Sequence, residues 1–451
     1  MIKEGKASKS KKVKYFELDK PYTLSQAIIE ADRCLLCYDS PCSQSCPAET
    51  DPGRFIKKLR LRNIKGAVKT IKENNILGGI CGLVCPVDKL CEEKCLATGI
   101  DRAINIGRLQ RFLVEYGWDI GFNPIDKKKN KNVNVAVVGS GPAGLTCAGE
   151  LAKDGFMVTI FEKNEKLGGI LRYGIPPYKL NDDFLDREIK DVLDLGVKVK
   201  TNYEFNGKGS IENLLKEGYK AIFVSTGLQN PYKLKIPGSD AKNVFTYHDF
   251  LWKINSGKVN EILDKVKDKN VLIVGGGSVA MDVAITCKLL NAKTVYCVAL
   301  ESMEDLPSDR EDLHKAIDHH VVIKPQSRIK EILTKNKEVI GARGNEIKLL
   351  KKGDFSPSNI KDISGTEFSF KVDMIIFAIG SGVDPKIKEY LPNIKFDDKG
   401  YIKVNKDTYE TSVKGIFAGG EIVTGPSLVV NAVRDGKKAA KSIINFLNKQ
   451  L

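Results

Sequence analysis

The sequence contains no apolar run long enough to cross a membrane. Its longest apolar stretches, 133–138 and 271–274, have the length of single strands, whereas a membrane-spanning helix needs about 20 apolar residues. A secretory signal is missing as well, because the basic opening MIKEGKASKSKKVKY is not followed by an apolar segment. We therefore expect a soluble, cytoplasmic protein.

The sequence also lacks the interleaved basic and aromatic residues on which nucleic-acid bases stack. Its net charge of +15 attracts polyanions in general, but it comes mainly from lysines that are spread along the chain. We expect no nucleic-acid and no membrane partner. With 451 residues, 42% of them hydrophobic, the chain is long enough for about three domains.

The first glycine-rich segment predicts a nucleotide-binding site. Gly139, Gly141 and Gly144 follow an expected strand and open an expected helix, so the backbone can approach a pyrophosphate at the helix N-terminus. Glu162 ends the next expected strand, where a carboxylate can accept hydrogen bonds from ribose hydroxyl groups. An unrelated turn can reproduce the glycine spacing alone, but the strand, helix and acid together favour a nucleotide site.

This part of the chain resembles FAD proteins of the glutathione-reductase-like class. Gly168 and Gly169 stand at the spacing found in that class, so the resemblance implies FAD. The segment from Phe417 to Glu421 resembles the second FAD motif of the class, in which an aspartate usually meets the ribityl chain. Here the residue is Glu421, whose longer side chain could shift or weaken that contact.

A second glycine-rich segment repeats the pattern and predicts the nicotinamide site. It runs from Gly275 to Asp282, follows the strand VLIV and opens a helix. Ala280 is small enough for close helix–strand packing where a third glycine might stand. A structural turn without a ligand is the alternative, but a flavin needs an electron donor and the chain repeats the fold.

The residues after the following strand indicate which nucleotide is used. NADP-using relatives that this chain resembles generally place arginines where it has Ala299, Leu300 and Glu301. An acid there accepts from the ribose hydroxyls and repels a 2′-phosphate, so we expect NADH rather than NADPH. Arg310 follows nearby in the sequence. It either reaches a 2′-phosphate, which would favour NADPH, or is an exposed charge on a helix. The candidate cofactor contacts of both sites are Gly139, Gly141, Pro142, Ala143, Gly144, Glu162, Gly169, Arg172, Thr226, Gly227, Gly275, Gly277, Ser278, Ala280, Asp282, Glu301, Gly380, Gly420, Glu421, Ser427 and Leu428.

Eight of the eleven cysteines fall within residues 34–95, in a chain without an export signal that would favour disulfides. Their spacing approaches the bacterial ferredoxin pattern and suits two 4Fe-4S clusters. Structural zinc is the alternative, but zinc modules tend to pair two C-x2-C knuckles and this segment has one. The runs are Cys34-x2-Cys37-x4-Cys42-x3-Cys46-Pro47, Cys81-x3-Cys85-Pro86 and Cys91-x3-Cys95. Cys147, Cys287 and Cys297 are scattered and predicted to lie in the core.

With these motifs in order, residues 22–444 resemble the electron-input module shared by glutamate synthase small subunits and dihydropyrimidine dehydrogenases. RCLLCYDSPCSQSCPAETDPGRFI, INIGRLQRF and GGGSVAMDVA are most similar to the flavin/iron-sulfur subunit of bacterial NAD-dependent dihydropyrimidine dehydrogenases. The resemblance implies one cluster held by Cys34, Cys37, Cys42 and Cys95, and another held by Cys46, Cys85, Cys91 and Gln110. Cys81 is then spare. Gln110 stands where glutamate synthase small chains usually have a glutamate.

The resemblance also implies a function and a partner. Electrons would pass from NADH through FAD and two 4Fe-4S clusters to a separate FMN/iron-sulfur subunit, which would reduce uracil or thymine in a hetero-oligomer. The alternatives are a glutamate synthase small subunit, an NAD(P)H-ferredoxin oxidoreductase, or a non-enzymatic zinc- and nucleotide-binding module. Disulfide reduction is disfavoured, because no CxxC pair follows Cys95.

The predicted fold is of the α/β class. A helical N-terminal domain with two 4Fe-4S clusters precedes two Rossmann-type dinucleotide-binding domains, and the NAD domain is inserted into the FAD domain. The expected segments are a basic flexible tail (1–20), the iron-sulfur domain (21–124), a linker (125–132), the FAD domain (133–240 and 376–451) and the NAD(P) domain (241–375).

Overall fold

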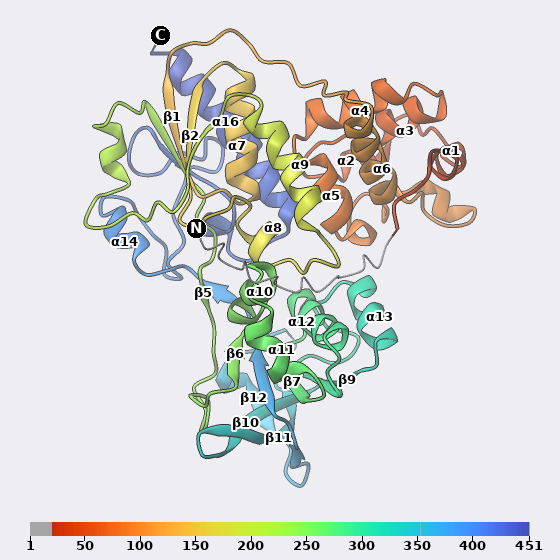
Figure 1. The fold of residues 1–451 in the computed structure, drawn as a ribbon, viewed down its shortest axis with the longest axis vertical. Helices are drawn as coiled ribbons and strands as arrows, with labels where there is room; N and C mark the ends of the chain where they lie inside the picture. Colours follow the sequence, from red (N-terminus) through yellow and green to blue (C-terminus); the bar gives the residue numbers. More distant parts are fainter. Residues whose placement is uncertain (1–19, 352, 451) are drawn as a thin grey trace, which may run out of the picture. The chain divides into compact units, whose positions relative to one another are not determined.

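The computed structural model describes residues 20–351 and 353–450, which fall into two units (Figure 1). The larger unit contains residues 20–175, 179–232 and 380–450, and the smaller unit contains 176–178 and 233–379. The chain therefore leaves the larger unit and later returns to it. Most of the basic tail expected at 1–20 lies outside the described residues. No helix in the described part of the chain is long and apolar enough to cross a membrane.

Residues 20–124 of the larger unit are helical and contain no strand, which confirms the prediction from their apolar spacing. Thr23 begins the first helix with a capping box that it forms with Gln26. Asp51 begins the third helix by accepting a hydrogen bond from the Arg54 N–H. The elements are α1 (Leu24–Asp32), α2 (Pro41–Gln44), α3 (Pro52–Arg60), α4 (Ile64–Asn74), α5 (Gly78–Val84) and α6 (Ile106–Asp119), with short 3-10 turns at Val87–Lys89 and Leu96–Gly99.

A five-stranded parallel sheet, in the order β16–β4–β1–β2–β3, forms the rest of the larger unit together with its helices. The last strand of the chain pairs with β4, so the C-terminal segment completes the sheet that residue 134 begins. The strands are β1 (Asn134–Val138), β2 (Met157–Phe161), β3 (Lys198–Lys200), β4 (Ala221–Val224) and β16 (Ile416–Ala418), and a separate pair is formed by β5 (Asn230–Pro231) and β15 (Ser381–Gly382). The helices are α7 (Pro142–Lys153), α8 (Ile170–Tyr173), α9 (Asp182–Leu193), α14 (Ile387–Tyr390), α15 (Glu421–Thr424) and α16 (Val429–Asn448), with a 3-10 turn at Glu212–Leu215.

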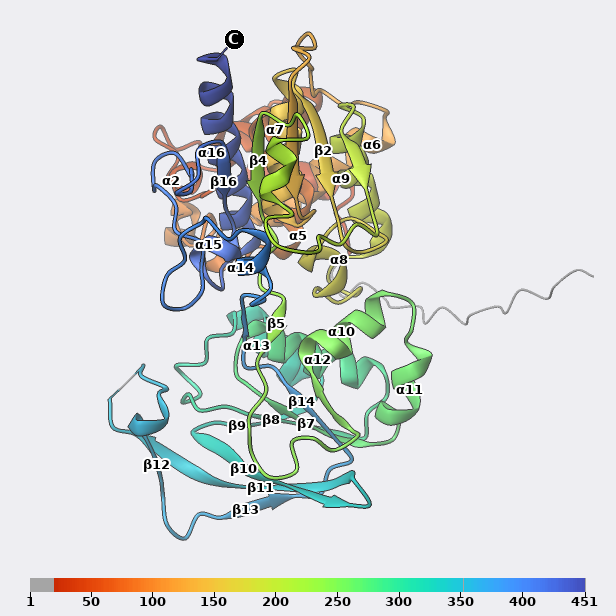
Figure 2. The same ribbon diagram turned by 90° about the vertical axis from the view of Figure 1, so that its left-hand side faces the viewer.

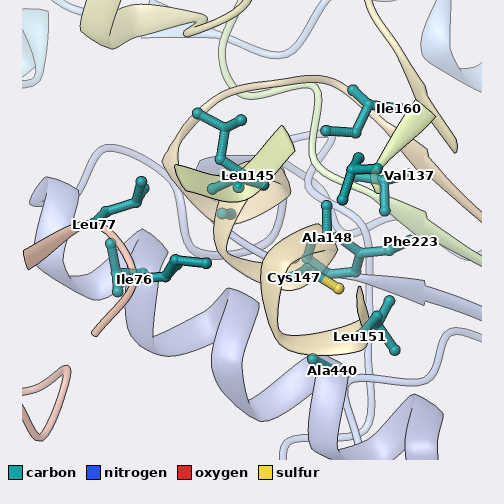
Figure 3. Packing of buried hydrophobic residues seen from close by; sticks show 14 of the residues in the cluster. Ile76, Leu77, Val137, Leu145, Cys147, Ala148, Leu151, Ile160, Phe223 and Ala440 are labelled. Carbon is teal, nitrogen blue, oxygen red and sulfur yellow. The ribbon is translucent and has the colours of Figure 1, made fainter. Parts of the chain in front are cut away.

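Two helices from distant parts of the sequence cross closely beside this sheet. α7 and α16 lie side by side (Figures 1 and 2), and a Cβ atom at Gly436 would overlap the carbonyl oxygen of Ala143. Only a glycine permits that approach. Figure 3 shows Cys147 and Leu151 of α7 close to Ala440 of α16 within one buried cluster.

The helical segment shares this core with the sheet. Ile76 and Leu77, between α4 and α5, belong to the same buried cluster as Leu145 and Ala148 of α7 (Figure 3). A Cβ atom at Gly149 would lie 2.5 Å from the Cδ1 atom of Ile76, so the two parts touch without a gap. The helical segment is therefore packed into the larger unit and is not a separate bead on the linker.

A buried ion network crosses the same contact. The Lys72 ammonium on α4 lies 2.7 Å from the carboxylates of both Glu188 and Asp191 on α9, and all three side chains are buried. Asp191 also accepts hydrogen bonds from the Trp118 indole at 2.9 Å and from the Asn123 amide at 3.2 Å. Every charged group in this network is therefore paired, as burial demands.

Glu188, the other carboxylate of the network, also fixes the start of α5. Glu188 accepts hydrogen bonds from the backbone N–H groups of Gly79 at 2.8 Å and Ile80 at 2.6 Å. Burial alone lowers the pKa of Lys72, but the two carboxylates outweigh it and hold that pKa above its usual value. Burial raises the pKa of Glu188, whereas Lys72 and the backbone N–H groups of Ile80 and Gly79 lower it, and the effect of burial prevails.

The smaller unit repeats the nucleotide-binding design and adds a layer that the sequence analysis did not predict. Its parallel sheet has the order β6–β14–β7–β8–β9, and an antiparallel sheet follows β9 (Figure 2). The parallel strands are β6 (Val244–Thr246), β7 (Asn270–Val274), β8 (Thr294–Val298), β9 (Val321–Lys324) and β14 (Met374–Phe377), and the antiparallel ones are β10 (Ser327–Lys335), β11 (Glu338–Leu349), β12 (Ile360–Asp362) and β13 (Phe368–Phe370). The helices are α10 (Tyr247–Asn255), α11 (Asn260–Val266), α12 (Ser278–Leu289) and α13 (Arg310–Asp318), with a 3-10 turn at Pro357–Asn359. Cys287 and Cys297 are buried in this unit, as predicted.

The buried network predicts unequal effects for two lysines of α4. Lys72→Met should lower the free energy of unfolding by about 3–5 kcal/mol, because it leaves two buried carboxylates without their cation. Lys69→Met removes an exposed ion pair with Glu73 and should change it by less than about 1 kcal/mol. Urea titrations followed by the fluorescence of Trp118 measure both variants. Equal effects would show that the network does not stabilise the larger unit.

Candidate cofactor and iron-sulfur sites

The first glycine-rich loop has the shape of a pyrophosphate cradle. Gly139 has a φ of +95°, and a Cβ atom there would lie 2.6 Å from the Ser225 carbonyl oxygen. A Cβ atom at Gly144 would overlap the carbonyl oxygen of Gly139, so this glycine allows α7 to approach β1. At Gly141 nothing lies within 4 Å of such an atom. The loop is therefore closed toward the protein and open at the N-terminus of α7, which fits a phosphate group.

Glu162 holds this loop from the end of β2. Its Oε2 atom accepts hydrogen bonds from the Ser140 N–H at 3.1 Å and the Ser140 hydroxyl at 2.6 Å. Its Oε1 atom accepts two more from the backbone and side chain of Asn164, at 2.8 and 3.0 Å. A carboxylate offers about four acceptor positions. A ribose hydroxyl would therefore replace one of these donors, and the ribose role of Glu162 stays a prediction.

The segment after β2 closes over the same loop. A Cβ atom at Gly169 would lie 2.8 Å from the Cα atom of Gly141, so a larger residue would push the segment off the cradle. Arg172 was predicted to contact a cofactor, but its guanidinium donates to Asp182 at 2.8 Å and to Asp186 on α9. The side chain is buried among these partners. Arg172 thus ties α8 to α9, and a cofactor contact stays a prediction.

Other predicted FAD contacts gather where β4 and β16 end. The sheet is parallel, so both strands end at the same edge as β1. A Cβ atom at Gly139 would lie 3.4 Å from the Cα atom of Thr226, and one at Gly420 would lie 3.1 Å from the Cβ atom of Ala143. Gly227 adjoins Thr226 in the same loop, with a φ of +65°.

Glu421 and the start of α16 follow in the chain. The Glu421 carboxylate accepts a hydrogen bond from the Ser427 N–H at 3.1 Å, and burial raises the pKa of its carboxyl group. Leu428 precedes the first turn of α16, and no side chain caps this helix. Gly380 accepts a hydrogen bond from the Tyr232 N–H at 2.9 Å, where the chain re-enters the larger unit. These positions and the cradle belong to one unit, and their contact with a cofactor stays a prediction.

The sequence analysis missed one buried acid of this region. Asp435 on α16 accepts hydrogen bonds from the Gly420 N–H at 3.2 Å, the Tyr409 hydroxyl at 3.0 Å and the Arg434 guanidinium at 2.9 Å. Burial and the Asp435 carboxylate raise the pKa of Tyr409 to about 12. The sequence feature that could have identified Asp435 is its position as an acid on the apolar face of a helix, between Ala432 and Ala439.

The second glycine-rich loop, in the smaller unit, repeats the cradle. Gly275 has a φ of +138°, and a Cβ atom there would overlap the carbonyl oxygen of Ala378. Gly277 precedes α12 and has open space where a Cβ atom would stand. Ser278 donates to Asp309 at 3.0 Å, and Ala280 is fully buried, as the close-packing prediction requires.

Two acids predicted to contact the nucleotide have different surroundings. Asp282 is buried and accepts a hydrogen bond from the Tyr178 hydroxyl at 2.7 Å. Glu301 lies over the glycine loop, because a Cβ atom at Gly276 would stand 3.1 Å from its Oε2 atom. Burial raises the pKa of Glu301. Arg310 is exposed at the first turn of α13.

Four cysteines line one cavity in the helical segment. The cavity has a volume of about 500 Å³ and is bordered by Cys34, Cys37, Cys42 and Cys95. These are the four that the resemblance assigns to one cluster. Burial, together with the thiols of Cys34 and Cys95, raises the pKa of Cys42 to about 11. Iron would reverse this shift, because a coordinating thiol is deprotonated by its metal.

A second group of thiols lies around the end of α5. A side-chain hydrogen bond with Cys81, and burial, raise the pKa of Cys85, and the neighbouring thiols of Cys91 and Cys46 act in the same direction. The Nε2 atom of Gln110, on α6, donates to the Gly78 carbonyl oxygen at 2.5 Å. Cys81 and Gln110 therefore both belong to the two helices that border this group.

The arrangement of the cysteines bears on the choice between zinc and iron-sulfur clusters. Among the residues that it describes, no three His, Cys, Asp or Glu side chains are arranged as ligands of a single metal ion. Four of the cysteines border a space instead, and a space bordered by thiols fits a polynuclear cluster. The four-cysteine cavity thus fits a 4Fe-4S cluster, and both glycine cradles fit dinucleotides.

Two family models match the chain. Residues 11–121 match the model described as dihydropyrimidine dehydrogenase domain II, 4Fe-4S cluster. Residues 133–436 match the model described as pyridine nucleotide-disulphide oxidoreductase. The matches follow the order of the cysteine-rich helical segment and the two glycine cradles.

Known proteins agree with these models over almost the whole chain. The NAD-dependent dihydropyrimidine dehydrogenase subunit PreT of Escherichia coli O157:H7 is 36% identical over 96% of this chain and 97% of its own. The glutamate synthase [NADPH] small chain of Escherichia coli K12 is 29% identical over 98% and 96%. The crystal structure of T. acidophilum thioredoxin reductase shares the fold at a TM-score of 0.54 and 20% identity, over 70% of this chain and 98% of that chain. The chain therefore belongs to the pyridine nucleotide-disulphide oxidoreductase family, as an NAD(P)H-dependent flavin oxidoreductase with an N-terminal 4Fe-4S domain.

Proposed function

We propose that this protein is the NADH-oxidising subunit of a dihydropyrimidine dehydrogenase and passes electrons to a separate subunit that reduces uracil or thymine. One observation carries the proposal. The larger unit contains both the four-cysteine cavity and the open cradle at Gly141, so a cluster and a dinucleotide can be held by one packed body. The relative with 36% identity is named as a subunit of such an enzyme.

The bound groups would supply chemistry that side chains lack, because FAD takes up a hydride as an electron pair and 4Fe-4S clusters carry electrons singly. The chain's own residues would bind these groups and orient them. The N–H groups at the start of α7 would hold the pyrophosphate of FAD beside Gly141. Glu162 keeps that loop in shape through Ser140, and the uncapped N-terminus of α16 offers further N–H groups.

We assign the first cluster to Cys34, Cys37, Cys42 and Cys95, which share the cavity. The second would be held by Cys46, Cys85, Cys91 and Gln110. The Gly78 carbonyl can only accept, so the Gln110 amide must turn its nitrogen toward it. Its Oε1 atom accepts no hydrogen bond from the described residues, which leaves this oxygen for iron.

The two ligand sets meet at α2. Cys42 lies within α2, and Cys46 lies two residues after the end of this helix. Burial and then Glu92 raise the pKa of Cys91 most, and the thiols of Cys46 and Cys42 raise it further. Short separation of the two sets favours transfer of single electrons between them. Thiolate ligands persist where thiols are kept reduced, and we accordingly place the protein in the cytoplasm.

Cluster content tests the ligand assignment. Protein purified without oxygen should contain about eight iron and eight sulfide per chain. Cys37→Ala should lose about half of each, whereas Cys81→Ala should keep both clusters and Gln110→Ala should not. Loss of about four irons in Cys81→Ala would assign the eighth ligand to Cys81 instead.

Nucleotide preference tests the position of Glu301. We expect NADH to be used about a hundredfold more efficiently than NADPH, since a half-buried carboxylate repels the 2′-phosphate and offers it no donor. Ala299 is buried, so the arginine is best placed at the next position. Leu300→Arg with Glu301→Ala should shift kcat/KM toward NADPH, measured as the rate of flavin reduction.

Glu304 provides the matched control for the nucleotide test. It is an exposed acid on the same loop, and Glu304→Ala should leave the preference unchanged. Equal use of both nucleotides by the unmodified protein would refute the NADH assignment. A preference that does not move in the double variant would mean that this loop does not reach the ribose.

The need for a partner follows from the parts that the two units contain. The proposed dinucleotide and cluster sites account for both units. The chain alone should therefore reduce an artificial dye with NADH, but it should not reduce uracil. Dihydrouracil formation, followed by loss of uracil absorbance, should begin when the FMN-containing subunit is added. Uracil reduction by the single purified chain would contradict the proposed division of labour.

A further inference from the structure

Large apolar side chains are exposed around the mouth of the four-cysteine cavity. Leu35, Leu36, Tyr38 and Leu96 all line the cavity and all are exposed, with Tyr38 at 106% relative exposure. They lie in the loop after α1 and in the turn after Cys95. Figure 1 shows α1 and α3 on the side of the larger unit away from its parallel sheet.

Leaving these side chains in water costs free energy that burial would recover. A partner that covers them would remove this cost in proportion to the apolar area that leaves water. Leu36 also has a φ of +55°, a conformation that is strained for a residue with a branched side chain. Contiguous exposed apolar groups next to a site typically mark a surface that a partner covers.

The charges at the mouth indicate what kind of partner this is. Of the charged residues that line the cavity, Arg54, Lys57 and Lys94 are cationic and exposed, and one, Asp51, is acidic. Lys94 is paired with Glu93 at 3.4 Å, so Arg54 and Lys57 carry the charge argument. Asp51 is occupied by the Ser43 hydroxyl at 2.8 Å and by the Arg54 N–H. Arg54 and Lys57 lie one turn apart on α3, and neither forms an ion pair with a described residue.

We infer that this mouth, defined as Leu35, Leu36, Tyr38, Leu96, Arg54, Lys57 and Lys94, is the docking surface for an electron-accepting protein whose own surface carries carboxylates around an apolar contact. The inference rests on the proposed function, because the cavity beneath the mouth is bordered by the proposed ligands of the first cluster. Two copies of this chain would repel each other here, since both would present the same cations.

Charge reversal tests the docking surface with two haem proteins of opposite charge. Both the acidic haem domain of cytochrome b5 and the basic cytochrome c accept one electron, and their reduction by NADH is followed by visible absorbance. The unmodified holoprotein should reduce cytochrome b5 faster, and added salt should slow that reaction. Arg54→Glu with Lys57→Glu should lower kcat/KM for cytochrome b5 at least about tenfold and raise it for cytochrome c.

Two exposed lysines far from the mouth supply a control of equal charge change. Lys208→Glu with Lys216→Glu, near the 3-10 turn Glu212–Leu215, should leave the order of the two haem proteins unchanged. Iron content and menadione reduction should match in all variants. If menadione reduction is normal but the charge reversal does not invert the order, the docking surface is wrong and the proposed function stands. If the unmodified protein does not reduce menadione, both fail.

Tyr38 tests the apolar part of the surface separately. Its ring is fully exposed, so Tyr38→Ser removes no contact that stabilises the chain. We expect the KM for cytochrome b5 to rise severalfold, with the iron content and the menadione rate unchanged. An unaltered KM would overturn the apolar contact. A dimer of the unmodified protein that Tyr38→Ser dissociates would instead show that the mouth joins two copies, and would overturn the inference.

Discussion

The pairing of Lys72 with Glu188 and Asp191 determines how the cysteine-rich helices sit on the rest of the larger unit. The three groups are buried, and they come from α4 and α9, which more than a hundred residues separate. A buried ion network contributes little net stability compared with apolar side chains of the same size. It does permit only one arrangement of its helices, because any shift would leave a buried charge unpaired.

This constraint extends into the site through hydrogen bonds. Glu188 fixes the N–H groups of Gly79 and Ile80, and the carbonyl of the preceding residue, Gly78, fixes the amide of Gln110. The start of α5 and the Gln110 amide on α6 are therefore positioned by a carboxylate of α9. Since α9 also receives the guanidinium of Arg172, one helix supports both the thiol group and the segment over the FAD cradle.

Local patterns predicted the parts of the molecule whose geometry is local. The spacing of Gly139, Gly141 and Gly144 indicated a strand, a tight turn and a helix, and the structure has each of them. The partners of Arg172 and Asp435 could not be predicted in this way, because they depend on which helices meet. The antiparallel strands β10–β13 were missed, since they follow a strand of the parallel sheet in the sequence without a motif of their own.

The residue at position 110 can be understood from the same constraints. A glutamate in place of Gln110 would direct a carboxylate oxygen at the Gly78 carbonyl, with which it cannot form a hydrogen bond unless it is protonated. An amide avoids this cost, because its nitrogen donates to the carbonyl. The carbonyl that Glu188 positions therefore favours glutamine over an ionised glutamate in this arrangement of the helices, whatever group the amide oxygen contacts.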